Sequence, residues 1–292
     1  MDYKYIKSNR ELNAYLRGFE EKKTHVIALD LEAELNRHAY GEKLCLVQIF
    51  NGESAVLIDP FNISTPTLKK LFESRNVLKV MYDASSDLSL MKNAYDIDIL
   101  SILDLRPAVD LLNFEAKNLH SVLAAELGVM LSDKAKFQKQ NWMRRPIDRR
   151  AIDYALNDVL HLLKLKDAIL ARLAEQKLLD IFILRNLQVQ VKDYTRNPAD
   201  RYRKVRGYHA LTEAEQTAFR KLYDVRDKYA QQTRMPVHNI VNNPSLLRLV
   251  REPDSLGELN FPRRFKAELS GAIRRDLKEA LKGLPKEKTA GG

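Results

Sequence analysis

The stretch Val26-Ile27-Ala28-Leu29-Asp30-Leu31-Glu32 decides how the first part of this chain folds. Its β-branched and apolar residues predict a strand from Thr24 to Leu31. Asp30 and Glu32 are two positions apart, so on a strand both side chains point to the same face. Two carboxylates on one face repel each other, and burying them is costly unless a cation compensates. The pair therefore indicates either a metal site in a cleft or a pair of charges that simply faces solvent.

The patterns around this stretch predict a layered domain. Asn51-Gly52 lies between two apolar runs, which is typical of a hairpin closed by a type I′ turn. Strands first and helices later, on a mixed sheet, indicate an α/β or α+β layer domain. The expected strands are 24–31, 44–50, 54–58 and 77–82, and the expected helices are 8–20, 84–95, 118–127 and 148–176.

Two further segments carry acidic residues at helical spacing. Asp83 and Asp87 are four residues apart, so they can share a helix face. Each can equally be a charge favoured by a helix N-terminus, and Asp83 is better suited to an N-cap or to a supporting position behind the metal ligands. Tyr154 and Asp158 are also four apart, on a helix whose other face is apolar. A phenol with a pKa near 10 is suited to orienting a water molecule; the alternative is a surface carboxylate beside a half-buried tyrosine.

The whole chain has the length and composition of a two-domain globular protein. It has 292 residues, of which 45% are apolar, enough for real cores. Cys45 is the only cysteine and lies in an apolar run, so no disulfide framework forms and a reducing compartment is favoured. The N-terminus has no apolar signal region, and no apolar stretch approaches the roughly 20 residues that span a bilayer. We expect a cytoplasmic protein that does not enter a membrane.

The positive charge is concentrated in the last third of the chain. Residues 1–190 contain 27 Lys+Arg and 26 Asp+Glu, whereas residues 191–292 contain 22 Lys+Arg and 13 Asp+Glu. A basic module next to a near-neutral domain is typical of polyanion binding. The connection between them holds Arg201, Arg203 and Arg206 among several tyrosines, a mixture that can bind phosphates and stack bases or be an ordinary solvated linker. Lys134 and Lys136 precede Trp142 and form a similar candidate.

The three acidic segments resemble the three motifs of the DEDD 3′–5′ exonuclease superfamily. The similarity is greatest to the ribonuclease D family, in the branch whose third motif is Tyr-x-x-x-Asp (DEDDy). Further similarity lies in Arg37, Tyr40, the run 44–48, and the Trp-x-x-Arg-Pro stretch at 142–146. Tyr82 departs from the pattern, because the family often has histidine there. Residues 208–283 resemble, more loosely, the helical module shared by helicases and ribonuclease D (HRDC).

This resemblance implies a fold, a mechanism and a substrate. The expected fold is a ribonuclease H-like mixed-sheet exonuclease domain at 1–190, a basic linker at 191–207, and an all-α HRDC-like domain at 208–284, followed by a disordered tail at 285–292. Asp30, Glu32, Asp87 and Asp158 would hold two Mg²⁺ ions, for which Mn²⁺ can substitute, and Tyr154 would orient the attacking water. The expected nucleic-acid-binding residues are Arg37, Tyr40, Lys134, Lys136, Trp142, Arg201, Arg203 and Arg206.

The expected activity is stepwise release of 5′-nucleoside monophosphates from RNA 3′ ends, with tRNA precursors as the implied substrate. No obligate protein partner is evident from the sequence. Two alternatives stay open. A DNA 3′–5′ exonuclease would use the same carboxylates, because sugar discrimination needs contacts to the 2′-OH. A non-catalytic RNA-binding module would retain the basic region without turnover.

Overall fold

The structure is a computed structural model that describes residues 2–131, 137, 140–197 and 200–282. These residues divide into two compact units. The first contains the described residues up to Glu34 together with Glu42–Thr195, and the second contains Leu35–Gly41 together with the described residues from Arg196 onward. The change of unit at Arg196 falls inside the stretch 191–207 that the sequence assigns to a linker.

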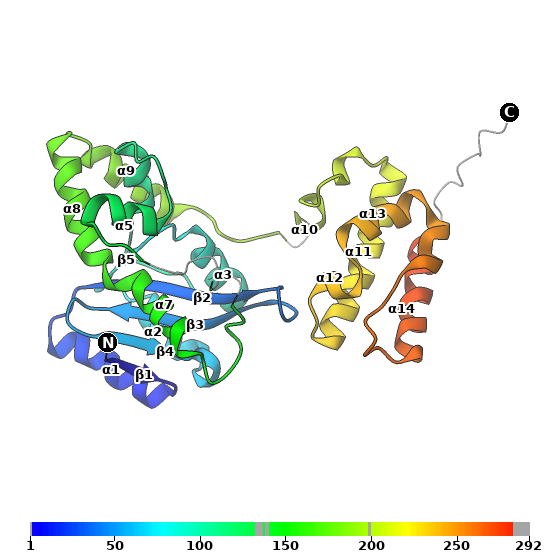
Figure 1. Cartoon of the computed structure of the whole chain (residues 1–292), viewed down its shortest axis with the longest axis horizontal. Coiled ribbons are helices and arrows are strands. Elements are labelled where there is room, and N and C mark those ends of the chain that lie inside the picture. The colour runs from blue at the N-terminus through cyan, green and yellow to red at the C-terminus, as the bar shows by residue number, and fades with distance from the viewer. Residues whose placement is uncertain (1, 132–136, 138–139, 198–199, 283–292) are drawn as a thin grey trace. The chain divides into compact units, whose positions relative to one another are not determined.

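The first unit is built on a six-stranded mixed sheet (Figure 1), as the sequence predicts. The strand order is β1-β4-β3-β2-β5-β6. β4 pairs antiparallel with β3 and parallel with β1, while β5 pairs parallel with both β2 and β6. The strands are β1 (Tyr3–Ile6), β2 (Val26–Leu35), β3 (Glu42–Phe50), β4 (Ala55–Ile58), β5 (Leu78–Met81) and β6 (Ile102–Asp104).

Helices cover both faces of this sheet. Ile27 and Leu29 of β2 share a core with α1, α2 and α3. Ala28, between them, shares a core with α4, α5, α8 and α9 on the other face. The helices of this unit are α1 (Asn9–Glu21), α2 (Thr65–Phe72), α3 (Ser85–Tyr95), α4 (Arg106–Leu111), α5 (Leu119–Leu127), α7 (Arg149–Leu160), α8 (Leu162–Glu175) and α9 (Leu179–Val191), with a short 3-10 turn at Pro60–Asn62. Successive residues of β2 therefore face different helical layers.

Two local predictions need correction. The β3–β4 hairpin forms, with Phe50 opposite Ala55, but its loop has four residues and only Gly52 has a positive φ. The Asn51 side chain accepts hydrogen bonds from the amides of Glu53 and Ser54, at 3.0 and 2.8 Å, and this closes a different turn. The predicted helix 148–176 is two helices, because the helical path breaks at His161. The break lets α7 pack on β3 while α8 packs on β5 and α5.

The second unit is helical and has its own core. Its elements are α10 (Asp200–Arg203), α11 (Glu213–Thr233), α12 (Val237–Ile240), α13 (Asn243–Arg251) and α14 (Ala267–Ala280), with 3-10 turns at Tyr208–Ala210 and Pro253–Glu258. A capping box of Thr212 and Glu215 starts α11. Phe219, Leu246 and Ile273, from three different helices, are all fully buried in one cluster. This unit thus buries apolar surface without needing the sheet.

None of the helices in the described part of the chain combines the length and apolarity needed to cross a bilayer.

Candidate active site

The acidic pair of β2 faces the helical layer that contains α7. Leu29 and Leu31 are buried in the core shared with α1, α2 and α3. Because side chains alternate along a strand, Asp30 and Glu32 point to the opposite face. Both remain half-buried, so they are not part of a closed core.

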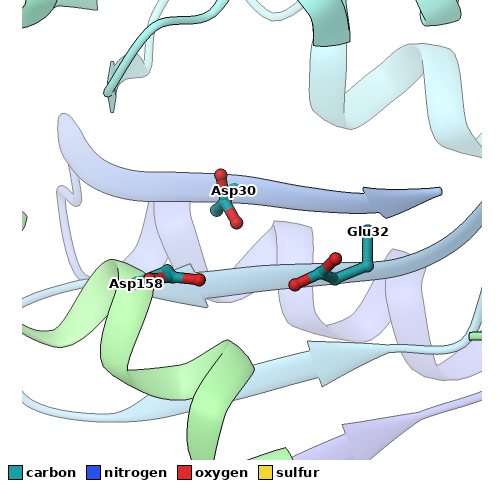
Figure 2. A group of neighbouring side chains, drawn as sticks. All are labelled: Asp30, Glu32 and Asp158. Carbon is teal, nitrogen blue, oxygen red and sulfur yellow. The ribbon is translucent and has the colours of Figure 1, made fainter. Parts of the chain in front are cut away.

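α7 brings a third carboxylate to this pair. The helix starts at the N-cap Asp148, whose side chain accepts from the Arg150 amide, and it buries Ala151, Ala155 and Val159. α7 packs against β3, and its Asp158 lies beside Asp30 and Glu32 of β2. Figure 2 shows Asp30, Glu32 and Asp158 with their carboxyl groups directed into a common space. One oxygen of each lies within 4.8 Å of the other two.

Electrostatics make this arrangement unfavourable without a cation. Burial raises the pKa of Asp30 well above its usual value, and the charges of Asp158 and Asp87 raise it further. Burial and then the charge of Asp30 raise the pKa of Glu32 in the same way. Three converging carboxylates supply only oxygen ligands, which is the donor set that hard divalent ions prefer. The site therefore fits a divalent metal ion.

Asp87 approaches from α3. Burial, followed by the charges of Asp104 and Asp83, raises its pKa to about 8. Its charge contributes to the raised pKa values of Asp30 and Glu32, although it does not belong to the 4.8 Å group. The sequence places this residue on the first turn of a helix, and α3 begins at Ser85.

The turn that starts α3 is held by a residue that the sequence patterns do not single out. Asp104, at the end of β6 and only 3% exposed, accepts hydrogen bonds from the amides of Asp83 and Ala84 at 2.8 and 3.1 Å. The sequence predicts Asp83 as the N-cap of this helix or as a supporting residue behind the metal ligands. Instead the N-cap position is Ala84, and Asp83 adopts a left-handed φ of 59°. The capping carboxylate comes from a neighbouring strand, which local spacing cannot reveal.

Tyr154 lies one helical turn before Asp158. Burial and then the charge of Asp158 raise its pKa further above the ordinary value for a phenol. Its ring is 5.5 Å from that of Phe137, measured between centroids. The hydroxyl is therefore protonated at neutral pH and can donate a hydrogen bond, but it is a poor base.

His120 is the second neighbour that sequence reasoning missed. Its Nε2 lies 3.2 Å from Oδ1 of Asp158. It belongs to α5, 38 positions earlier in the chain. No spacing rule joins these two residues, so only the tertiary fold could identify their proximity.

The predicted nucleic-acid-binding residues lie in different settings. Trp142 is only 4% exposed and packs in the core with α7, so its ring has no free face for a base, contrary to the prediction. Lys134 and Lys136 lie outside the described residues. Arg37 and Tyr40 belong to the second unit, as do Arg201, Arg203 and Arg206, which are exposed.

The Trp-x-x-Arg-Pro stretch fastens the segment before α7 to the sheet. Arg145 donates to the Asp59 carboxylate at 2.5 Å, to the Cys45 carbonyl at 2.6 Å and to the Trp142 carbonyl at 2.6 Å. Its guanidinium also stacks over the Phe61 ring, 4.3 Å from the centroid. These contacts fix where α7 begins and hence where Tyr154 and Asp158 stand.

Comparison with curated proteins gives several relatives called ribonuclease D. The chain is 26% identical over 238 residues to ribonuclease D of Cronobacter turicensis, covering 80% of this chain and 64% of that protein. It is 29% identical over 230 residues to ribonuclease D of Xanthomonas oryzae pv. oryzae, covering 78% of this chain and 62% of that protein. The chain therefore spans less than two thirds of the length of these relatives.

Solved structures share the fold at low identity. Escherichia coli RNase D, an exoribonuclease involved in structured RNA processing, superimposes with a TM-score of 0.76 at 22% identity, over 97% of this chain and 76% of that one. The catalytic core of RRP6 from Trypanosoma brucei gives a TM-score of 0.76 at 19% identity, over 96% and 79%. These matches confirm the predicted ribonuclease H-like exonuclease fold of the first unit.

A family model described as 3′-5′ exonuclease matches residues 3–174, which include all four acidic residues and Tyr154. The match covers more than half of the 292 residues. The chain belongs to the 3′–5′ exonuclease family.

Proposed function

We propose that this protein is a metal-dependent 3′–5′ exoribonuclease that removes nucleotides from RNA 3′ ends as 5′-nucleoside monophosphates. The observation that carries the proposal is the convergence of Asp30, Glu32 and Asp158, whose oxygens lie within 4.8 Å of one another although β2 and α7 are far apart in sequence. Family membership supports hydrolysis from a 3′ end. Similarity to ribonuclease D supports RNA as the polymer.

The metal is proposed to be Mg²⁺, with Mn²⁺ able to replace it. Asp30, Glu32 and Asp158 would hold it, and Asp87 would join them to complete sites for two ions. When bound, such ions acidify water and stabilise the charge that develops on the leaving oxygen. The raised pKa values of Asp30 and Glu32 support this assignment, because a bound cation would compensate both the burial of these charges and their mutual repulsion.

The protein's own side chains would position the reactants. Tyr154 keeps its proton, so its hydroxyl can fix the orientation of the attacking water beside Asp158 without taking a proton from it. His120 would hold the Asp158 carboxylate in one orientation through the contact at 3.2 Å. Asp104 would keep Asp87 in place by fixing the start of α3.

We propose further that the helical unit binds RNA beyond the cut end. The domains would be an exonuclease domain at 1–190, a linker at 191–207 and an HRDC-like domain at 208–284. The exposed arginines 201, 203 and 206 and the excess of basic residues in 191–292 support phosphate contacts. tRNA precursors or other structured RNAs are the proposed substrates, and the single buried cysteine is compatible with a cytoplasmic location.

The test is degradation of a 5′-labelled RNA with Mg²⁺, Mn²⁺ or a chelator, with products identified by chromatography. The proposal predicts a ladder that shortens from the 3′ end, 5′-monophosphate products, and no reaction with the chelator. Asp158→Asn should abolish turnover, whereas Asp153→Asn, an exposed carboxyl on the same helix, should not. Equal turnover by the Asp158 variant and the wild type would overturn the assignment.

A matched DNA oligonucleotide in the same assay shows whether RNA or DNA is the preferred substrate. Faster cleavage of DNA than of RNA would identify the protein as a DNA exonuclease. The proposed metal site would still stand. Loss of all cleavage with retained RNA binding would leave only a binding module.

A further inference from the structure

α9 exposes an unusual amount of apolar surface. Seven large hydrophobic side chains are exposed among the described residues, and five of them lie on this helix: Ile181, Ile183, Leu184, Leu187 and Val191. Their exposed fractions run from 44% for Ile181 to 81% for Val191. Ile183, Leu187 and Val191 are spaced four residues apart, so with Leu184 they form one continuous stripe along the helix.

The opposite side of α9 is buried within the first unit. Phe182 and Asn186 are 1% and 5% exposed and pack toward α4, α8 and β6. Figure 1 shows α9 grouped with α5 and α8 at one end of the sheet. The helix is therefore held by its inner face, while the apolar stripe lies on its outer face. Exposed apolar side chains gathered in one patch typically mark an interaction site.

The charges at the two ends of α9 suit a second copy of the same helix. Asp180 lies in the first turn, and Lys192 follows the last residue. Both side chains are exposed. In an antiparallel pair crossing near Leu187, Asp180 of each copy comes beside Lys192 of the other, and the stripe meets itself across the two-fold axis. The opposed helix dipoles add to this match, since each negative end then lies beside a positive one.

We propose that this stripe is the interface of a homodimer, in which α9 of two copies packs antiparallel about a two-fold axis. The apolar stripe forms the core of the interface, and the Asp180–Lys192 pairs form its rim. A stable interface buries about 800 Å² on each partner, so polar residues around the stripe must contribute as well. The proposal is independent of the nuclease activity, because no residue of the acidic cluster takes part.

The first test measures the mass of the full-length protein by sedimentation over the micromolar range. The wild type should change from monomer to dimer as concentration rises. Leu187→Glu should raise the dimer dissociation constant at least about 100-fold, because the buried anchor occurs twice at a two-fold interface. Met130→Glu is the matched control, since Met130 is 85% exposed in the same unit but lies outside α9. Thermal melting checks that both variants fold.

A second test addresses the geometry. Cys45 is the only native cysteine and is fully buried, so an introduced cysteine reports on its own surroundings. Leu187→Cys should form an intermolecular disulfide under mild oxidation, and Met130→Cys should not. Asp180→Lys should weaken the dimer, and adding Lys192→Glu should restore it. A wild type that stays monomeric throughout the range, or a dimer that Leu187→Glu leaves unchanged, would overturn the proposal.

Discussion

At the scale of single residues, the carboxylates of the acidic cluster repel one another in the metal-free protein, and the same carboxylates would bind a metal ion. Asp30, Glu32 and Asp87 all have raised pKa values in the folded protein. The folded state then binds protons more tightly than the unfolded chain does. A raised carboxyl pKa therefore lowers stability as the pH rises, which is opposite to the usual effect of a salt-bridged carboxylate.

This balance predicts a pH-dependent stability of the metal-free protein. The contribution of Asp87 is fully present below about pH 4, its unfolded pKa, and is lost as the pH rises through about 8. Urea unfolding in chelator should show wild-type stability falling from pH 5 to 8 (roughly the window between these two values), and Asp87→Asn should reduce that fall. Added Mg²⁺ should restore stability at the upper end. If the stability of the wild type and that of the variant changed in parallel with pH, the predicted contribution of Asp87 would be contradicted.

A substitution at Tyr154 can test the role of its hydroxyl in catalysis without disturbing the fold. Tyr154→Phe keeps the ring that packs against Phe137 and removes only the hydroxyl. We expect unchanged melting temperature and metal affinity, with turnover reduced about 10²-fold or more, as for the loss of a group that positions a transferred proton. Single-turnover kinetics measures the effect. Wild-type rates in the variant would remove the hydroxyl from the mechanism.

His120 should act on metal affinity through Asp158. His120→Ala removes the interaction at 3.2 Å, so the carboxylate can rotate away from the cluster. Losing a partner that orients a metal ligand typically lowers affinity about 10–100-fold. Calorimetric titration with Mn²⁺ measures this directly, and His25→Ala, an exposed histidine, is the control. Equal affinities for both variants would make the interaction incidental.

At the scale of elements, the sequence predicts what local periodicity controls. The two-residue spacing of Asp30 and Glu32 places them correctly on one face of β2, and Asn118 and Asp148 are the caps that begin α5 and α7. Properties set by distant partners were not predictable. The break at His161 depends on which strands α7 and α8 cover, and β1 is a four-residue strand that exists because it pairs with β4.

The links between α9, β6 and α3 also depend on tertiary contacts. The Asn186 side chain accepts from the Asp104 amide at 2.7 Å, and the Asp104 carboxylate in turn holds the start of α3. Asn186→Ala leaves that buried amide without its partner, which should cost about 1–3 kcal/mol of stability. Urea unfolding measures this loss. Gln188→Ala, on the exposed face of the same helix, should be nearly neutral, and a neutral Asn186 variant would contradict this role.

At the scale of the whole molecule, the distribution of charge should govern substrate affinity. Residues 191–292 carry 22 basic and 13 acidic residues. Replacing Arg201, Arg203 and Arg206 by glutamine should raise KM while leaving kcat unchanged, because these residues are expected to touch phosphates far from the reacting bond. The slope of log affinity against log salt should fall by about 0.7 for each phosphate that is no longer neutralised.

The matched control for this triple variant replaces three exposed arginines of the first unit, Arg10, Arg17 and Arg75. It changes the net charge by the same amount, so a general electrostatic effect would appear in both variants. An unchanged salt slope in the triple variant of residues 201, 203 and 206 would place the RNA-binding surface elsewhere.

The proposed activity depends on carboxylates from β2, α3 and α7 holding divalent metal together. Anomalous diffraction from a crystal of the full chain soaked in Mn²⁺ tests this most directly. We expect strong peaks bounded by Asp30, Glu32 and Asp158, with Asp87 beside them, and loss of those peaks in Asp30→Asn. A well-ordered crystal with these four side chains resolved and no manganese among them would contradict the metal-dependent mechanism.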